Sequence, residues 1–324
     1  MSEKIKWKDA LLRSNMPLEF EAARMLVAEG FAVNSDFRYS WNDSAERGES
    51  SVDLHAKTGI PFEIGKDPAA QIELLTDCTH RAPNTAALFL PDPNLPEISP
   101  VSPGHTIRVI DQFSPYIIEP DAVTVFESDL SVCYKGMEID LKTGEVDNDL
   151  YQHGLQRLRN PLPRLFTENV MNFMTGSRSE NIPFLFCPIF LTTSPLYVLR
   201  KDVTLEEIAN ADKLEEVGIS VPYLIMYANL SPKFKTVCVN ECRQMREILR
   251  TEKGMEIEMK KVRYYNNHFN LPFTIIDALT VPEYYFMNAF FSQFFVCSSK
   301  HFHDLVTALK KTIIEAVETR KILV

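Results

Sequence analysis

Apolar positions in the chain follow two periods, which divide the sequence into expected helices and strands. Residues 17–29 carry an apolar stripe at helical spacing, and Gly30 follows at a usual stop position for a helix. Apolar and polar residues alternate over 52–56 and over 71–79, as is typical of strands with one buried face. The pattern therefore predicts a helix followed by two strands in this part of the chain.

The segments around these elements are less regular. Residues 31–33 predict a short strand, and the polar, glycine-containing segment 41–51 predicts a turn or loop. The proline-rich stretch 91–104 is unsuited to the middle of a sheet, and indicates a semi-rigid connection. Short alternating runs within 106–145, closed by a turn at 142–145, predict a β-rich insertion.

The second half of the chain alternates again between helix and strand. Residues 149–175 have a helical pattern that Pro161 and Pro163 interrupt, and 183–191 is so apolar that it indicates a strand buried on both faces. Thr204 and Glu207 have the spacing of a capping box, which predicts a helix start. Further elements are expected as strands at 197–199, 223–227 and part of 284–296, and as an amphipathic helix at 303–320.

Composition narrows the class of protein. Hydrophobic residues make up 45% of the 324 and charged residues 24%, which excludes wholesale disorder, and only 11 glycines argue against a nucleotide-cradling loop. The net charge of −10 excludes a protein that binds nucleic acid through an overall basic surface. A polar N-terminus and the absence of long apolar runs predict a cytoplasmic protein with no membrane span. The cysteines are then expected to be buried thiols.

The candidate chemistry begins with two aspartates on the predicted strands. Asp53 lies on the polar face of one strand, and Asp77 shares a face with Gln71, Glu73 and other residues of the next. If the strands are neighbours, the two carboxylates lie close together, where they raise a pKa or bind a divalent cation. A hard cation such as Mg²⁺ takes oxygen ligands and also binds phosphate, so the pair suggests phosphodiester cleavage.

Four segments together resemble a known family of nucleases. They are Leu18-Glu19-Phe20-Glu21, Gly30-Phe31, the strand at 51–56 and the strand at 72–80. This order resembles the PD-(D/E)XK restriction-endonuclease-like nucleases, above all the Mrr-type branch. The resemblance covers residues 17–81 closely and 150–230 loosely, and does not extend to 91–145 or 231–324.

The resemblance implies a role for each matching residue. Glu19 corresponds to the helix acid that helps to hold a metal or its water, with Glu21 as a rival. Asp53 and Asp77 correspond to the metal ligands for Mg²⁺ or Mn²⁺, and the Cys78 carbonyl is able to join them. The family's activity, hydrolysis of nucleic acid by metal-activated water, is then the expected function, in a setting of defence or repair.

One position departs from the family's motif. The lysine two residues after the second acid, which polarises the attacking water, is replaced here by Thr79. The missing cation is expected from Arg81 on the same strand face or from Lys66 in a neighbouring loop. His55 or His80 is the alternative, as a base.

A basic cluster offers contacts to nucleic-acid phosphates. Arg157, Arg159 and Arg164, with His153, lie within one helical segment, and Arg81 follows the second metal-binding strand. The alternative interpretation of the cluster is a solvated helix face.

The expected fold is α/β, with a restriction-endonuclease-like core in which helices flank a central mixed sheet of four or five strands. Residues 1–85 and 149–230 form this core, 86–148 the β-rich insertion, and 231–324 a C-terminal helical extension that packs on or completes the core. Two further hypotheses stand beside the nuclease. One is a catalytically inactive nuclease fold that serves as a binding or regulatory module. The other is a subunit that associates with itself or with a protein partner.

Overall fold

The structure of the protein is a computed structural model. It describes residues 3–42, 47–60, 68–93, 108–110, 116–117, 130–175, 182, 184–249, 287–288, 291–318 and 321–322. The helices are α1 (Glu3–Arg13), α2 (Met16–Ala28), α3 (Leu150–Arg159), α4 (Leu162–Thr175), α5 (Leu205–Asn210), α6 (Pro232–Leu249) and α10 (Phe302–Glu318). The strands are β1 (Ala32–Asn42), β2 (Arg47–Ile60), β3 (Ala70–Thr79), β4 (Thr85–Pro91), β5 (Arg108–Ile110), β6 (Tyr116–Ile117), β7 (Val132–Asp140), β8 (Val146–Asp147), β9 (Phe184–Thr192), β10 (Leu196–Leu199), β11 (Gly218–Val221), β12 (Tyr223–Tyr227), β13 (Gln293–Ser298) and β14 (Lys321–Ile322).

One mixed sheet of 12 strands organises the described part of the chain, in the order β1-β2-β3-β9-β13-β12-β7-β4-β10-β11, with β5 paired to β9 and β8 to β7. β1, β2 and β3 form an antiparallel meander, after which β9 lies parallel to β3 and β13 parallel to β9. The mixed sheet is confirmed, but it is larger than the four or five strands expected. The extra strands come from the segment predicted as an insertion, which supplies β4 and β7, and from the C-terminal part, which supplies β13.

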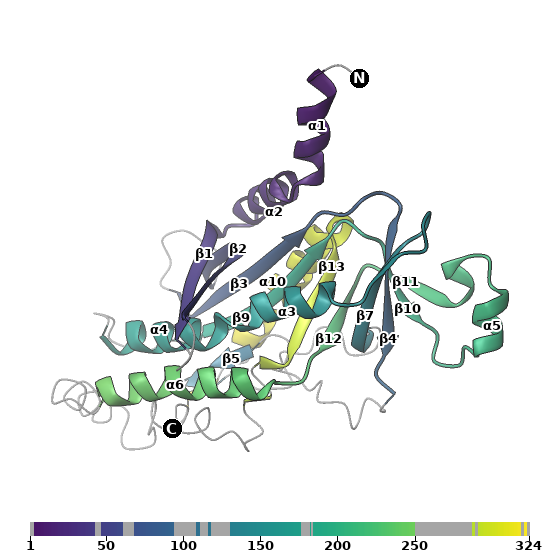
Figure 1. The fold of residues 1–324 in the computed structure, drawn as a ribbon. Helices are drawn as coiled ribbons and strands as arrows, with labels where there is room; N and C mark the ends of the chain where they lie inside the picture. The colour runs from purple at the N-terminus through teal and green to yellow at the C-terminus, as the bar shows by residue number, and fades with distance from the viewer. Residues whose placement is uncertain are drawn as a thin grey trace.

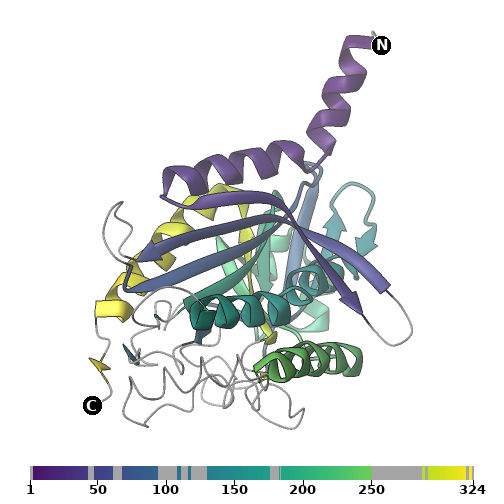
Figure 2. The ribbon, with the colours of Figure 1, turned by 90° about the vertical axis from the view of Figure 1, so that its left-hand side faces the viewer.

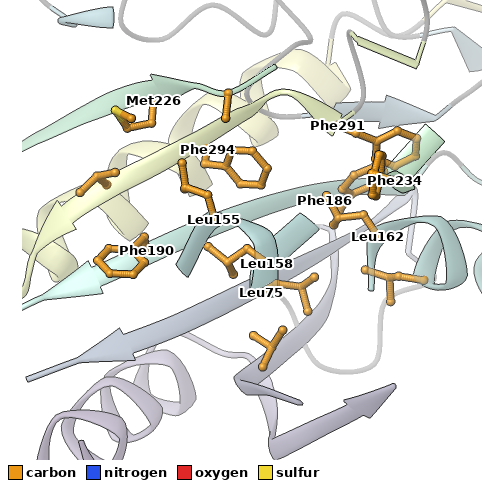
Figure 3. Packing of buried hydrophobic residues seen from close by; sticks show 14 of the residues in the cluster. Leu75, Leu155, Leu158, Leu162, Phe186, Phe190, Met226, Phe234, Phe291 and Phe294 are labelled. Atoms are coloured by element: carbon orange, nitrogen blue, oxygen red, sulfur yellow. The ribbon is translucent and has the colours of Figure 1, made fainter. Parts of the chain in front are cut away.

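Helices cover both faces of this sheet (Figure 1). The layer with α3, α4 and α6 buries one hydrophobic cluster, and the layer with α2 and α10 buries the other. Figure 2 shows α2 and α10 on the side of the sheet opposite α3 and α6. In Figure 3, Leu155 and Leu158 of α3 lie among Leu75, Phe190 and Phe294 of the sheet. The expectation of an α/β fold with a helix-flanked sheet is therefore confirmed.

Most of the predicted elements have the predicted type. The helix expected at 17–29 is α2, which ends at Ala28, and Gly30 follows shortly after it with a φ of 91°. The run at 183–191 is β9, all of whose residues are buried. Thr204 and Glu207 form the expected capping box of α5. The final amphipathic helix is α10.

The turn or loop predicted over 41–51 is wrong at both of its ends. β1 continues to Asn42 and β2 begins at Arg47, so the two strands form a long antiparallel hairpin. The outer ends of the two strands have a largely polar sequence, and backbone pairing satisfies their N–H and C=O groups, so the hydrophobic pattern gives no signal there. Residues 118–129 of the predicted β-rich insertion and most of the proline-rich stretch 91–104 lie outside the described residues.

A close approach holds α3 against the centre of the sheet. A Cβ added to Gly154 would lie 2.1 Å from Cε2 of Phe190 on β9, far inside van der Waals contact. Gly154→Ala is therefore expected to lower the free energy of unfolding by about 1–3 kcal/mol, the usual cost of overpacking a core. Urea denaturation measures this change. Gln152→Ala, at an exposed position of the same helix, is the control and should have little effect. Equal stability of both variants would contradict this account of the packing.

Candidate functional site

Asp53 and Asp77 lie side by side on neighbouring strands. β2 and β3 are antiparallel, and their pairing ends at Leu54 opposite Thr76, which are the neighbours in sequence of Asp53 and Asp77. Oδ2 of Asp53 accepts a hydrogen bond from the backbone N–H of Cys78 at 2.6 Å, which ties the carboxylate to β3. The sequence prediction that the two strands are neighbours, with both acids close together, is confirmed.

Two more acids come from the elements before β2. The β1 residues that flank Asp36 pair with the β2 residues that flank Asp53, so the two aspartates occupy matching places on their strands. Asp36 has a φ of 53°, in the left-handed region that aspartate tolerates better than most residues. Glu19, in the first turn of α2, lies close enough for the charges of Asp53 and Asp36 to act on it. Four consecutive elements thus each contribute one carboxylate.

These carboxylates hold protons more tightly than free acids do. Burial, and then the charges of Asp53 and Asp36, raise the pKa of Glu19. Burial also raises the pKa of Asp53. The largest effect is on Asp77, which is fully buried: burial raises its pKa to about 7, with the charges of Asp53 and Glu19 adding to the rise. Buried acids that repel one another either keep a proton or bind a cation.

Arg157 supplies positive charge to this cluster. It reaches over from α3, and its Nη2 donates to Oδ2 of Asp77 at 2.7 Å. Its charge lowers the pKa values of Glu19, Asp53 and Asp77, against the effect of burial. The Arg157 side chain is 41% exposed, so solvent reaches the guanidinium while the Asp77 carboxylate stays buried. The other oxygen of Asp77, Oδ1, has no hydrogen-bond partner among the described residues.

The residues expected to replace the missing lysine are not found beside Asp53 and Asp77 in the described part of the chain. Thr79 is buried at the end of β3, beside Thr192 of β9. Nε of Arg81 lies 3.0 Å from Oε2 of Glu138 on β7, which turns this side chain away from the acids to another ion pair. Lys66 lies outside the described residues. The residue that does meet Asp77 is Arg157, which the sequence suggested only as a phosphate contact.

A second polar cluster lies on the same two strands, and the sequence interpretation missed it. Nε2 of His55 lies 2.6 Å from Oε2 of Glu73, and Nζ of Lys57 lies 3.1 Å from Oε1 of the same carboxylate. Gln71 donates both to Glu73 and to Asn169 of α4. Burial works to raise the pKa of Glu73, but His55 and Lys57 together hold it below the usual value. Glu73 is therefore an ionised acid in a satisfied network.

The remaining arginines of the predicted basic cluster have separate roles. Arg159 is buried and donates to the carbonyl oxygens of Phe291, Asn229 and Ala228, so its prediction as a nucleic-acid contact is wrong for this fold. Its guanidinium holds neighbouring segments together and has no free face for a phosphate. Arg164 lies on α4 and pairs with the partly exposed Glu168 one turn later. Its prediction as a phosphate contact stays untested.

The donor set suits a hard divalent cation, although the described residues contain no preformed group of three or more histidine, cysteine, aspartate or glutamate side chains arranged to hold a metal. Glu19, Asp53 and Asp77 offer the carboxylate oxygens that Mg²⁺ and Mn²⁺ prefer. The unpartnered Oδ1 of Asp77 is a further oxygen open to a cation. The Cys78 carbonyl as a ligand stays a prediction; the Cys78 thiol itself is buried, and burial raises its pKa well above the usual value.

A comparison of the chain with protein-family models, with curated proteins and with solved structures finds no match. No helix in the described part of the chain is long and apolar enough to cross a membrane.

The raised pKa of Asp77 makes the stability depend on pH. The folded protein keeps a proton on Asp77 up to a pH of about 7, whereas the unfolded chain releases it near the ordinary value of 3.8. Protons bound only by the folded state stabilise it, and that stabilisation is lost as pH rises from about 4 to about 7. We expect the free energy of unfolding of the wild type to fall over this range relative to that of Asp77→Asn, measured by urea denaturation. A constant difference between the two proteins would contradict the raised pKa.

Proposed function

We propose that the protein is a divergent nuclease of the restriction-endonuclease-like type, dependent on Mg²⁺ or Mn²⁺, which hydrolyses the phosphodiester bonds of nucleic acid. The observation that carries this proposal is the meeting of Asp53 and Asp77 on neighbouring strands, with Glu19 added from the preceding helix. Glu19, Asp53 and Asp77 lie on α2, β2 and β3, close enough for their charges to act on one another. Oδ1 of Asp77 has no hydrogen-bond partner among the described residues, and the pKa of Asp53 is raised. Both observations support a cation-binding site.

Each residue then has a definite task. Asp53 and Asp77 would hold the cation, and Glu19 would orient a water molecule beside it. The bound metal supplies a more acidic water and neutralises charge on the phosphate. Arg157, released from Asp77, is placed to stabilise the negative charge that develops on the phosphate oxygens, the task of the lysine that Thr79 replaces. The guanidinium suits this task because it stays charged and binds phosphate through two donors.

The proposal is tested by cleavage of plasmid, single-stranded DNA and RNA in the presence of Mg²⁺ or Mn²⁺. The wild type is compared with the double variant Asp53→Asn/Asp77→Asn, which keeps the size of both side chains. We expect cleavage by the wild type only, at a rate that EDTA abolishes. Equal cleavage by both proteins would assign the activity to a contaminant or to another site. No cleavage of any substrate by the wild type would favour the second candidate function.

That second candidate is an inactive nuclease fold kept as a binding module. The ion pair between Arg157 and Asp77 favours it, because Asp77 is already partly neutralised without any metal. Titration calorimetry with Mn²⁺ separates the two candidates. Binding that is lost in Asp53→Asn/Asp77→Asn supports the nuclease, whereas no binding by the wild type supports the module.

A further inference from the structure

The N-terminal helix α1 stands apart from the rest of the fold. It projects beyond both helical layers and joins the body through α2 (Figures 1 and 2). Trp7, Leu11 and Leu12 are 63%, 41% and 51% exposed, respectively. Large apolar side chains gathered on a projecting helix are characteristic of an interaction surface. Residues 6–13 of α1 are called the arm here.

The arm is also basic in an acidic protein. Residues 6–13 contain three basic side chains and one acidic one, while the whole chain carries a net charge of −10. Lys6 and Lys8 lie on either side of Trp7, and all three are exposed. A partner for the arm should therefore combine exposed apolar side chains with negative charge.

A second projecting part of the same chain has these complementary properties. Residues 200–219, called the lobe here, include α5 and the start of β11 and extend from the sheet in a different direction from the arm (Figure 1). Leu205 is 86% exposed, and Ile208 and Ile219 are exposed as well. The lobe contains six acidic and three basic residues.

The lobe also has a concave face. An open hollow of about 360 Å³ lies beside α5, and its lining residues include Glu206, Glu207 and Glu216, together with Arg200. Within the lobe, Glu207 is engaged by the cap of α5 and by Arg200. Among the described residues, Glu206 makes no such ion pair, and it lines the hollow, so a basic side chain from outside would find negative charge there.

We propose that the arm of one copy of this chain docks on the lobe of a second copy. Trp7, Leu11 and Leu12 would cover the exposed apolar side chains of the lobe, and Lys6 and Lys8 would meet its glutamates. The apolar contact supplies affinity, with the tryptophan as the expected main contributor, and the opposite charges set which surfaces meet. Because two different surfaces join, the contact either closes reciprocally in a dimer or continues along a row of copies.

Sedimentation velocity over a range of protein concentrations at low salt tests the proposal. The wild type should sediment as more than one copy at high concentration. Two charge reversals, Lys6→Glu/Lys8→Glu on the arm and Glu206→Lys/Glu216→Lys on the lobe, should each weaken association at least about tenfold, because like charges then face each other. Lys142→Glu/Lys311→Glu, two exposed positions outside both surfaces, is the matched control and should associate like the wild type.

A mixture of the two reversed variants gives the decisive result. The acidic arm of one variant can then meet the basic lobe of the other, so the mixture should associate although neither variant does alone. A wild type that stays monomeric at all concentrations would overturn the proposal. So would variants that associate as the wild type does, or a mixture that stays monomeric. The outcome is independent of any nuclease activity.

Discussion

Replacement of Arg157 by alanine is expected to separate metal binding from cleavage. In the structure its guanidinium occupies Oδ2 of Asp77, where a cation would bind. Removal of this competitor leaves Glu19, Asp53 and Asp77 without the positive charge that now lowers their pKa values. The affinity for Mn²⁺ above pH 7 should therefore rise, by roughly tenfold, since like charges that repel one another favour a bound cation.

The same substitution should slow cleavage. If Arg157 performs the task of the missing lysine, its loss removes a charge that stabilises the transition state, and the rate should fall by about 10²–10³-fold. Calorimetry gives the Mn²⁺ affinity, and single-turnover cleavage gives the rate of the chemical step. Arg157→Lys should recover part of the rate, because it restores charge without the paired donors.

Lys311→Ala is the matched control, because Lys311 is exposed on α10 and pairs with Glu315 one turn later, away from the site. In this variant the Mn²⁺ affinity and the cleavage rate should each stay within about twofold of the wild-type values, as expected for a surface ion pair. A rate that Arg157→Ala leaves unchanged would remove Arg157 from the mechanism. An unchanged Mn²⁺ affinity would show that the cation binds away from Asp77.

Replacement of Arg159 by alanine should have the largest effect on stability. Its Nε, Nη1 and Nη2 donate to three carbonyl oxygens, and its guanidinium packs over the rings of Phe234 and Phe294. Burial lowers its pKa to about 10, so the side chain stays charged at neutral pH. The variant leaves buried carbonyl groups without donors, and we expect the free energy of unfolding to fall by about 3–5 kcal/mol.

Urea denaturation of Arg159→Ala, with Arg164→Ala as the control, checks this expectation. Arg159→Ala should shift the unfolding midpoint strongly, and Arg164→Ala hardly at all. A loss below about 1 kcal/mol in Arg159→Ala would mean that water replaces the guanidinium at those carbonyls.

The parts of the fold that the sequence predicts are those determined by local periodicity. β9 is recognisable because residues 184–191 are all apolar, and the cap at Thr204 because both of its partners lie within four residues. The hairpin of β1 and β2 is not, because the sequence of its outer half is largely polar and gives no hydrophobic alternation. The same limit explains the size of the sheet: the position of β13 between β9 and β12 depends on contacts far along the chain.

The candidate site likewise contains residues that the sequence predicts and residues that it does not. Local alternation and a short spacing are enough to predict that Asp53 and Asp77 lie on neighbouring strands. Arg81 follows Asp77 closely in sequence, which predicts a contact with the acids. In the fold, Arg81 forms an ion pair with Glu138 of β7 instead. Arg157 meets Asp77 only because α3 crosses over β3, and no local pattern encodes that crossing. Long-range partners are the part of a site that a single sequence does not reveal.

The place of β13 has a consequence for how the protein is made. β13 lies in the sheet between β9 and β12, yet it comes after both in the chain. While the ribosome is still translating the residues before 293, the apolar edges of β9 and β12 have been synthesised but lack this partner. The nascent chain therefore exposes unpaired, hydrophobic strand edges late into synthesis, the kind of surface that chaperones bind and that aggregates when it is left uncovered.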